Sequence, residues 1–158
     1  MRQLDVVGVR VEMPRNAPMV LLREVEGSRF LSIWIGAGEA SAIASAQEGL
    51  VPQRPLTHDL IVDVLAALDH SVTQVRITKL ERGTFFALLV IGDQEISCRP
   101  SDGIAVAVRT GTPIYCAEEV LDEAGIADPD PSANDEPEEE QVEKFREFLD
   151  HVTPEDFG

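Results

Sequence analysis

A strand–turn–helix pattern occurs twice in this chain, and the repeat constrains the fold more than any other feature. The copies cover residues 30–49 and 95–111, and each passes from a β-rich run into an Ala-rich helical run that ends at a glycine. In both copies an acidic residue, Glu39 or Asp102, stands at the start of the helical run. A carboxylate there stabilises the positive end of the helix dipole. The repeat therefore predicts two units with the same order of elements.

Hydrophobic periodicity predicts further elements around both copies. Each unit has three strands before its helix, one helix is inserted between the units, and a short strand and a helical turn follow the second unit. The expected strands are 4–12, 19–25, 29–35, 72–81, 84–91, 94–99 and 114–117, and the expected helices are 38–48, 58–69, 102–110 and 119–124. Thr57 and Ser101 are the expected N-caps of the second and third helices.

The helices of the two units are apolar around most of their circumference, which is typical of buried helices. We therefore predict an α+β domain built from two β3-α units in a three-layer β/α/β arrangement with an inserted helix. We expect Trp34, the only tryptophan, to belong to the core rather than to a base-stacking surface. The domain is expected to span 1–127, followed by an acidic flexible linker at 128–141 and a C-terminal amphipathic helix at 142–152.

The net charge of −16 is unevenly distributed along the chain. The first 117 residues contain 11 Lys or Arg and 13 Asp or Glu, whereas the last 41 contain 2 and 16. The acidity of the tail disfavours nucleic acid as a partner of the tail, and the nearly neutral body leaves the question open. The C-terminal helix is expected to dock on its own domain or on a sister subunit.

Several features point to a cytoplasmic protein. The sequence has no apolar run of the roughly 18 residues that a membrane-spanning helix needs, and its N-terminus lacks a signal-peptide pattern. The two cysteines, Cys98 and Cys116, lie in apolar runs. In a reducing compartment they are expected to be buried free thiols rather than a disulfide.

Few residues are candidates for chemistry, and the richest group lies at the start of the inserted helix. Asp59 and Asp63 are four residues apart, so they share a helix face and could hold a divalent ion such as Mg²⁺ or Mn²⁺. His58 is their neighbour. The simpler interpretation, which residue types alone favour, is that Asp59 stabilises the helix start while His58 donates a hydrogen bond.

The repeated units supply the other candidates. Glu39 and Asp102 are each either a general base or metal ligand, or a residue that stabilises its helix. Arg99 and Arg109 either bind phosphate or pair with those acids.

Three ordered segments carry a resemblance to a known family. They are Leu31-Ser32-Ile33-Trp34-Ile35-Gly36 with Glu39-Ala40, Arg54-Pro55-Leu56-Thr57-His58-Asp59-Leu60, and Arg99-Pro100-Ser101-Asp102-Gly103-Ile104-Ala105-Val106-Ala107. In order and spacing they resemble the signature blocks of the bifunctional nuclease family, over about residues 2–125. The segment from Val142 to Phe157 is similar to the tail of actinobacterial members.

The resemblance implies a compact β/α/β domain that often self-associates, and a nuclease that cleaves RNA and DNA with little sequence preference. On this interpretation the catalytic residues are Glu39, His58, Asp59, Asp102 and Arg99, the phosphate-binding residues are Arg99, Arg109 and Arg54, and the metal ligands are Asp59 and Asp63. The partners are then nucleic acid and a second copy of the chain, as a homodimer or higher homo-oligomer. The alternative is a non-catalytic dimeric module that binds a small ligand or a protein.

Overall fold

The computed structural model describes residues 1–128, and every element expected there is present. The elements are β1 (Arg2–Glu12), β2 (Ala17–Glu24), β3 (Phe30–Trp34), α1 (Ala37–Gln47), α2 (Thr57–Ala67), β4 (Gln74–Glu81), β5 (Thr84–Ile91), β6 (Gln94–Cys98), α3 (Pro100–Thr110), β7 (Ile114–Cys116) and α4 (Glu118–Ala124). The predicted α+β class is confirmed. The predicted linker at 128–141, beyond Asp128, and the helix at 142–152 lie outside the described residues.

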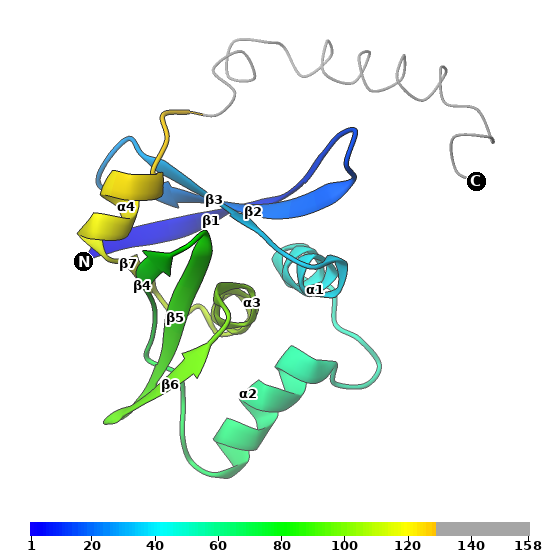
Figure 1. Ribbon diagram of the computed structural model, residues 1–158. Coiled ribbons are helices and arrows are strands. Elements are labelled where there is room, and N and C mark those ends of the chain that lie inside the picture. Colours follow the sequence, from blue (N-terminus) through cyan, green and yellow to red (C-terminus); the bar gives the residue numbers. More distant parts are fainter. Residues whose placement is uncertain (129–158) are drawn as a thin grey trace, which may run out of the picture. The chain divides into compact units, whose positions relative to one another are not determined.

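The two three-stranded units belong to one sheet. Its order is β3-β2-β1-β7-β4-β5-β6, so β7 joins the first strands of the two units. β7 is antiparallel to β1 and parallel to β4. Figure 1 shows the two halves of the sheet turned toward each other, with α1 and α3 in the angle between them. α1 packs on β1 and β2, whereas α3 packs on β4 and β5. The pair of helices thus has sheet on more than one side, as predicted, and both sides belong to a single continuous sheet.

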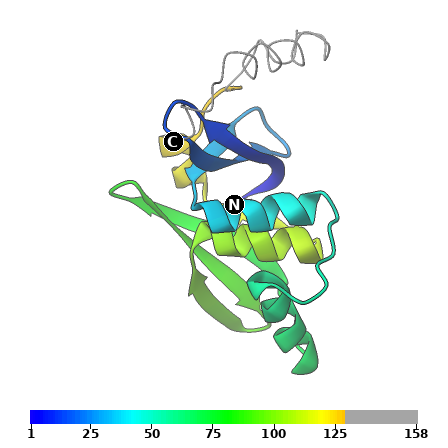
Figure 2. The same cartoon turned by 90° about the vertical axis from the view of Figure 1, so that its right-hand side faces the viewer.

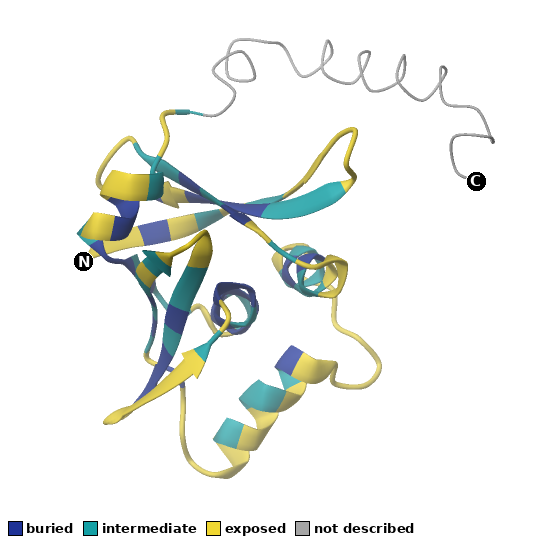
Figure 3. Ribbon diagram, in the orientation of Figure 1, coloured by how far each residue is buried: buried dark blue, intermediate teal, exposed yellow. Residues whose placement is uncertain are grey.

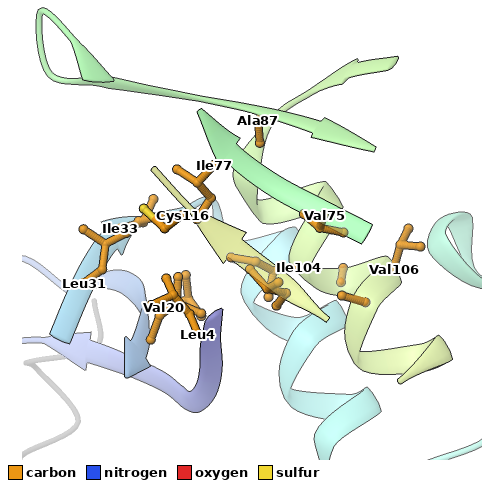
Figure 4. Close-up of a cluster of buried hydrophobic side chains, with 14 of the residues drawn as sticks. Leu4, Val20, Leu31, Ile33, Val75, Ile77, Ala87, Ile104, Val106 and Cys116 are labelled. Atoms are coloured by element: carbon orange, nitrogen blue, oxygen red, sulfur yellow. The ribbon is translucent and has the colours of Figure 1, made fainter. Parts of the chain in front are cut away.

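The two repeated helices lie side by side (Figure 2) but differ in burial. Seven of the 11 residues of α3 are buried, whereas α1 buries only Ala40 and Ile43. Figure 3 shows α3 almost wholly buried and α2 mostly exposed. The apolar core gathers around α3 and combines side chains of both sheet halves, with Ile104 on the side of Leu4 and Val20 (Figure 4).

The inserted helix α2 carries two apolar rows with different environments. Ile61 and Leu65 pack against the core. Leu60, Val64 and Leu68 are each about half exposed or more. Only part of the predicted apolar stripe of this helix is therefore used within the domain.

Three local predictions were wrong. The N-caps are Leu56 and Arg99, so that Thr57 and Ser101 lie inside the first turns of α2 and α3. Pro100 takes the first position of α3, where its missing N–H has no cost. Trp34 is 55% exposed and is not a core residue.

Two further findings bear on the sequence predictions. Both cysteines are free thiols, with Cys116 buried and Cys98 partly buried. None of the helices between residues 1 and 128 is both long enough and apolar enough to span a membrane.

Candidate functional site at three helix starts

The first turns of α1, α2 and α3 each carry an acidic residue at the third helical position. These residues are Glu39, Asp59 and Asp102. α3 packs against both α1 and α2, and side-chain hydrogen bonds from Arg99 to Glu39 and between His58 and Asp102 link the three helix starts. The fold therefore gathers the polar residues of all three sequence blocks, but it divides them between two arginines, Arg99 and Arg109.

The first group is the Arg99 cluster, which consists of Glu39, His58, Arg99 and Asp102. His58 Nε2 lies 2.8 Å from Asp102 Oδ1. Arg99 donates from Nε to Asp102 Oδ2 at 2.8 Å and from Nη2 to Asp102 Oδ1 at 3.2 Å. The same Nη2 donates to Glu39 Oε1 at 2.8 Å. The equivalent acids of the two repeated units thus share one guanidinium.

Burial differs sharply within the Arg99 cluster. The side chain of His58 is 10% exposed and that of Arg99 is 65% exposed. Glu39 and Asp102 lie between these extremes. The cluster is therefore a shallow site in which the imidazole is held inside and the guanidinium faces solvent.

The carboxylates of the Arg99 cluster are held in their charged forms. Burial by itself raises the pKa of Asp102, but hydrogen bonds from Arg99 and His58 outweigh it and bring this pKa below its ordinary value of 3.8. A backbone N–H bond and then the Arg99 bond lower the pKa of Glu39. With a neutral His58, the four side chains carry two negative charges and one positive charge.

The second group is the Arg109 cluster, which consists of Asp59, Arg109 and the carbonyls of Ala42 and Ala105. Arg109 Nε donates to Asp59 Oδ1 at 2.7 Å, and Nη1 donates to the Ala42 and Ala105 carbonyls at 3.1 and 2.9 Å. The Arg109 side chain is only 10% exposed. One guanidinium thus ties α1, α2 and α3 together.

Asp59 also fixes the start of its own helix. Its Oδ2 accepts the backbone N–H of Leu56 at 3.0 Å. Hydrogen bonds from Arg109 and from this N–H hold the pKa of Asp59 below its ordinary value of 3.8. Asp59 adjoins His58 in the sequence, so fixing this turn also fixes the backbone that carries the imidazole.

The proposed metal pair, Asp59 and Asp63, lines a pocket of about 310 Å³ together with Arg109. Both Asp59 oxygens already accept hydrogen bonds. Within residues 1–128 no group of three or more His, Cys, Asp or Glu side chains comes together in a metal-binding arrangement. The described residues do not make a preformed metal centre, since the engaged Asp59 leaves only Asp63 of this pair as a free carboxylate and most of the ligands of a divalent ion would have to be water or substrate.

Arg99 is part of the wall of a second, larger pocket, which we call the Trp34 pocket. Its volume is about 440 Å³, and it is lined by Ile33, Trp34, Ile35, Gly36, Gly83, Thr84, Phe85, Arg99, Pro100 and Ser101. Sequence reasoning missed Trp34 as a surface residue. The signal was present, because β-strand alternation places it on the face opposite the buried Leu31 and Ile33.

Two of the predicted phosphate-binding residues lie apart from the Arg99 cluster. Arg109 belongs to its own buried cluster. Arg54 is exposed on the connection between α1 and α2. Arg99 is the predicted phosphate-binding residue that the structure places beside His58 and Asp102.

Comparisons with known proteins identify the family of the chain. The family model described as "Bifunctional nuclease domain" matches residues 20–129, which include all three sequence blocks. Two proteins described as uncharacterized, from the CDC 1551 / Oshkosh and H37Rv strains of Mycobacterium tuberculosis, are each 53% identical to this chain over 161 residues. The alignments cover 99% of this chain and 98% of each relative. The chain belongs to the bifunctional nuclease domain family.

Proposed function

We propose that the Arg99 cluster hydrolyses phosphodiester bonds of nucleic acids by general acid–base catalysis, with His58 as the base. The observation that carries this proposal is the 2.8 Å contact between His58 Nε2 and Asp102 Oδ1. A carboxylate that orients an imidazole is a recurrent arrangement in hydrolytic sites. It joins two of the three blocks that carry the family resemblance.

The contact assigns the protons of the imidazole. An ionised carboxylate only accepts hydrogen bonds, so Nε2 of His58 carries the proton and a neutral ring has its lone pair on Nδ1. Among the described residues the imidazole of His58 has no other hydrogen-bond partner, and none of their solvent-shielded side-chain polar atoms lacks a partner. Nδ1 therefore touches solvent, where it can take a proton from water.

The reaction then has a simple proton balance. The oxygen of a water molecule attacks phosphorus while Nδ1 of His58 takes its proton, and the bond from phosphorus to the leaving oxygen breaks. The imidazolium that forms is stabilised by Asp102 and returns the proton to the leaving oxygen. Arg99, with its exposed guanidinium, stabilises the charge that develops on the phosphoryl oxygens.

The other predicted residues take supporting roles in this proposal. Glu39 holds Arg99 from the α1 side. Asp59 and Arg109 position His58 by fixing the first turn of α2 on α1 and α3. Metal binding by Asp59 and Asp63 and phosphate binding by Arg54 stay predictions.

Hydrolysis of labelled single-stranded RNA and DNA by the purified full chain tests this proposal. We expect His58→Ala and Asp102→Asn each to lower the rate by about 10²- to 10⁴-fold with the fold retained. Parallel reactions with EDTA measure any dependence on a divalent ion. His70→Ala is the matched control, because His70 is exposed and lies beyond the end of α2. Equal rates for the wild type and a folded His58→Ala variant would refute the assignment.

A second candidate function, a dimeric binding module, is favoured by the surface of α2. Leu56, Leu60, Val64 and Leu68 recur every four residues, and each is about half exposed or more. Such a row is self-complementary when two copies meet across a two-fold axis. We propose a second copy of this chain as its occupant.

The oligomeric state tests this proposal independently of hydrolysis. Sedimentation of the full chain should give a dimer, and the Leu60→Ser plus Val64→Ser variant should give a monomer. Arg54→Ser is the surface control. A monomeric wild type at high concentration would refute the proposed interface.

A further inference from the structure

We propose that the Trp34 pocket binds one unpaired base of a single-stranded nucleic acid and that Arg99 holds the adjoining phosphate. The inference rests on the function proposed above for its general substrate class, and it adds strand state and a binding subsite. Its evidence is the exposure of Trp34, the shape of the pocket and the unused hydrogen-bonding capacity of Arg99.

The first step concerns Trp34 itself. Ile33 is buried, whereas Trp34 at the end of the same strand is 55% exposed. The strand partner of Trp34 is Met19. The sulfur of Met19 already accepts a hydrogen bond from the Ser32 hydroxyl, at 3.0 Å. A large indole surface is thus left in contact with water, and an aromatic face gains stability when a planar base covers it.

The second step concerns the size and the walls of the pocket. A volume of about 440 Å³ lies within the range of small-ligand sites. Phe85, partly buried, adds a second aromatic ring to the lining. Gly83 presents only backbone to the same space and has no neighbouring heavy atom where a Cβ would stand, so a planar group can approach there without meeting a side chain. At Gly36 the corresponding space is taken by the Glu39 carboxylate.

The third step concerns Arg99, which lines the pocket and also belongs to the Arg99 cluster. Its Nε and Nη2 donate to Asp102 and Glu39. Its Nη1 donates no hydrogen bond to any residue of the described part of the chain. With two free N–H groups on an exposed guanidinium, Arg99 can receive a phosphate oxygen. Base and phosphate sites are then adjacent, as they are in a nucleotide.

The fourth step explains the preference for single strands. In a duplex the bases are stacked on each other, and a protein aromatic ring can stack on a base only after that base is released. Electrostatic attraction to phosphate does not offset the cost of releasing a base from a duplex, because Glu39 and Asp102 offset the charge of Arg99. The attraction to phosphate is therefore modest, and stacking on Trp34 decides which nucleic acid binds.

The single tryptophan makes a direct experiment possible. Intrinsic tryptophan fluorescence of the full chain reports on Trp34 alone, since the sequence has one Trp. Titration with a short oligothymidylate should quench this emission, whereas a duplex of equal length should leave it nearly unchanged. Inorganic phosphate should weaken oligonucleotide binding without quenching. The logarithm of the binding constant should fall with the logarithm of salt by only about 0.7 for each phosphate contacted.

Variants separate stacking from charge. By anisotropy of a labelled oligothymidylate, Trp34→Ala should weaken binding about tenfold, and Trp34→Phe should weaken it less because it keeps a ring. Arg99→Ala should weaken binding and flatten the salt dependence. Val11→Ala, which shortens a comparably exposed apolar side chain on β1, is the control and should bind as the wild type does.

The outcomes distinguish this inference from the proposed hydrolysis. Quenching by single strands without any hydrolysis supports the pocket and refutes the proposed catalysis. Hydrolysis with no quenching, or with Trp34→Ala binding as tightly as the wild type, overturns the pocket and leaves catalysis standing. Equal quenching by duplex and single strand also overturns the inference. His58→Ala, titrated in parallel, checks that the quenching comes from an intact oligonucleotide.

Discussion

The Arg99 and Arg109 clusters use the same chemistry in different surroundings. In each, an arginine meets a carboxylate at the third position of a helix, at 2.8 Å for Arg99 and Asp102 and at 2.7 Å for Arg109 and Asp59. The side chain of Arg99 is 65% exposed, whereas that of Arg109 is 10% exposed. The difference teaches that position in the fold, rather than residue type, separates a candidate for chemistry from a structural tie.

Hydrogen-bond partners sharpen the same contrast. Arg109 uses its donors on Asp59 and on two backbone carbonyls of neighbouring helices. Arg99 bonds only side chains and shares Asp102 with His58. A guanidinium bonded to backbone carbonyls fixes the helices that it joins, and one with a free N–H group can still take a ligand.

The largest expected effect compares the two aspartates in hydrolysis. Asp102→Asn should lower the rate by about 10³-fold, because a neutral amide neither orients the neutral ring of His58 nor stabilises its charged form. Asp59→Asn should lower it by about tenfold or less, by loosening the turn that carries His58. Single-turnover cleavage of a labelled oligonucleotide measures both. Similar losses of cleavage rate in the two variants would show that Asp102 and Asp59 do not differ in their roles.

The second prediction compares the arginines in stability. Arg109→Ala should lower the free energy of unfolding by about 3 kcal/mol, because it leaves Asp59 and two carbonyls without their partner. Arg99→Ala should cost about 1 kcal/mol or less, since exposed ion pairs contribute little. Urea denaturation followed by circular dichroism measures both differences. An Arg99→Ala variant that is the less stable of the two would contradict this ranking.

The third prediction concerns acid. Because Asp59 and Asp102 have pKa values below 3.8 in the folded chain, the unfolded chain binds more protons as the pH approaches that value. The stability that they contribute is fully present at neutral pH and is lost as the pH falls from about 5 through 3.8 and below. Urea midpoints across this range should fall less steeply in Asp59→Asn than in the wild type. An unchanged slope would show that Asp59 is not held by its ion pair.

The smallest expected effect concerns salt. Raising the salt concentration should remove most of the small stability difference between Arg99→Ala and the wild type, because exposed charges are screened. The difference for Arg109→Ala should persist, because its pair is shielded from solvent. Urea midpoints at low and high salt measure changes of about a few tenths of a kcal/mol. Equal salt sensitivity in both variants would remove the distinction between the clusters.

Most of the fold was predictable because its signals are local. Apolar alternation located the strands, and the acids and glycines marked both repeated helices. The errors at Thr57 and Ser101 are also local, since other residues at the same turns took the cap positions. The role of β7 was not predictable, because its three residues join strands that are far from it in sequence.

The candidate site was predictable as a set of residues but not as an arrangement. Sequence reasoning placed Asp59 with the catalytic residues through the family resemblance and with Asp63 through their spacing on one helix face. In the structure Asp59 instead accepts a hydrogen bond from Arg109, which is 50 residues away in the sequence. Helix periodicity explains why this happened, since adjacent residues of a helix point about 100° apart and so face different neighbours. Trp34 is the opposite case. Strand alternation already indicated that Trp34 lies on the face opposite Leu31 and Ile33, and the expectation of a core residue was wrong.

By itself the sequence determined the two β3-α units, the acidic start of each helix and the family to which the chain belongs. These properties follow from backbone propensity and side-chain periodicity, which act over a few residues. Only the tertiary structure decided that Glu39, His58, Arg99 and Asp102 form one cluster, that Asp59 and Arg109 form another, and that Trp34 faces solvent. Those outcomes depend on how the sheet closes around α1 and α3, and that packing places side chains from distant segments within hydrogen-bonding distance.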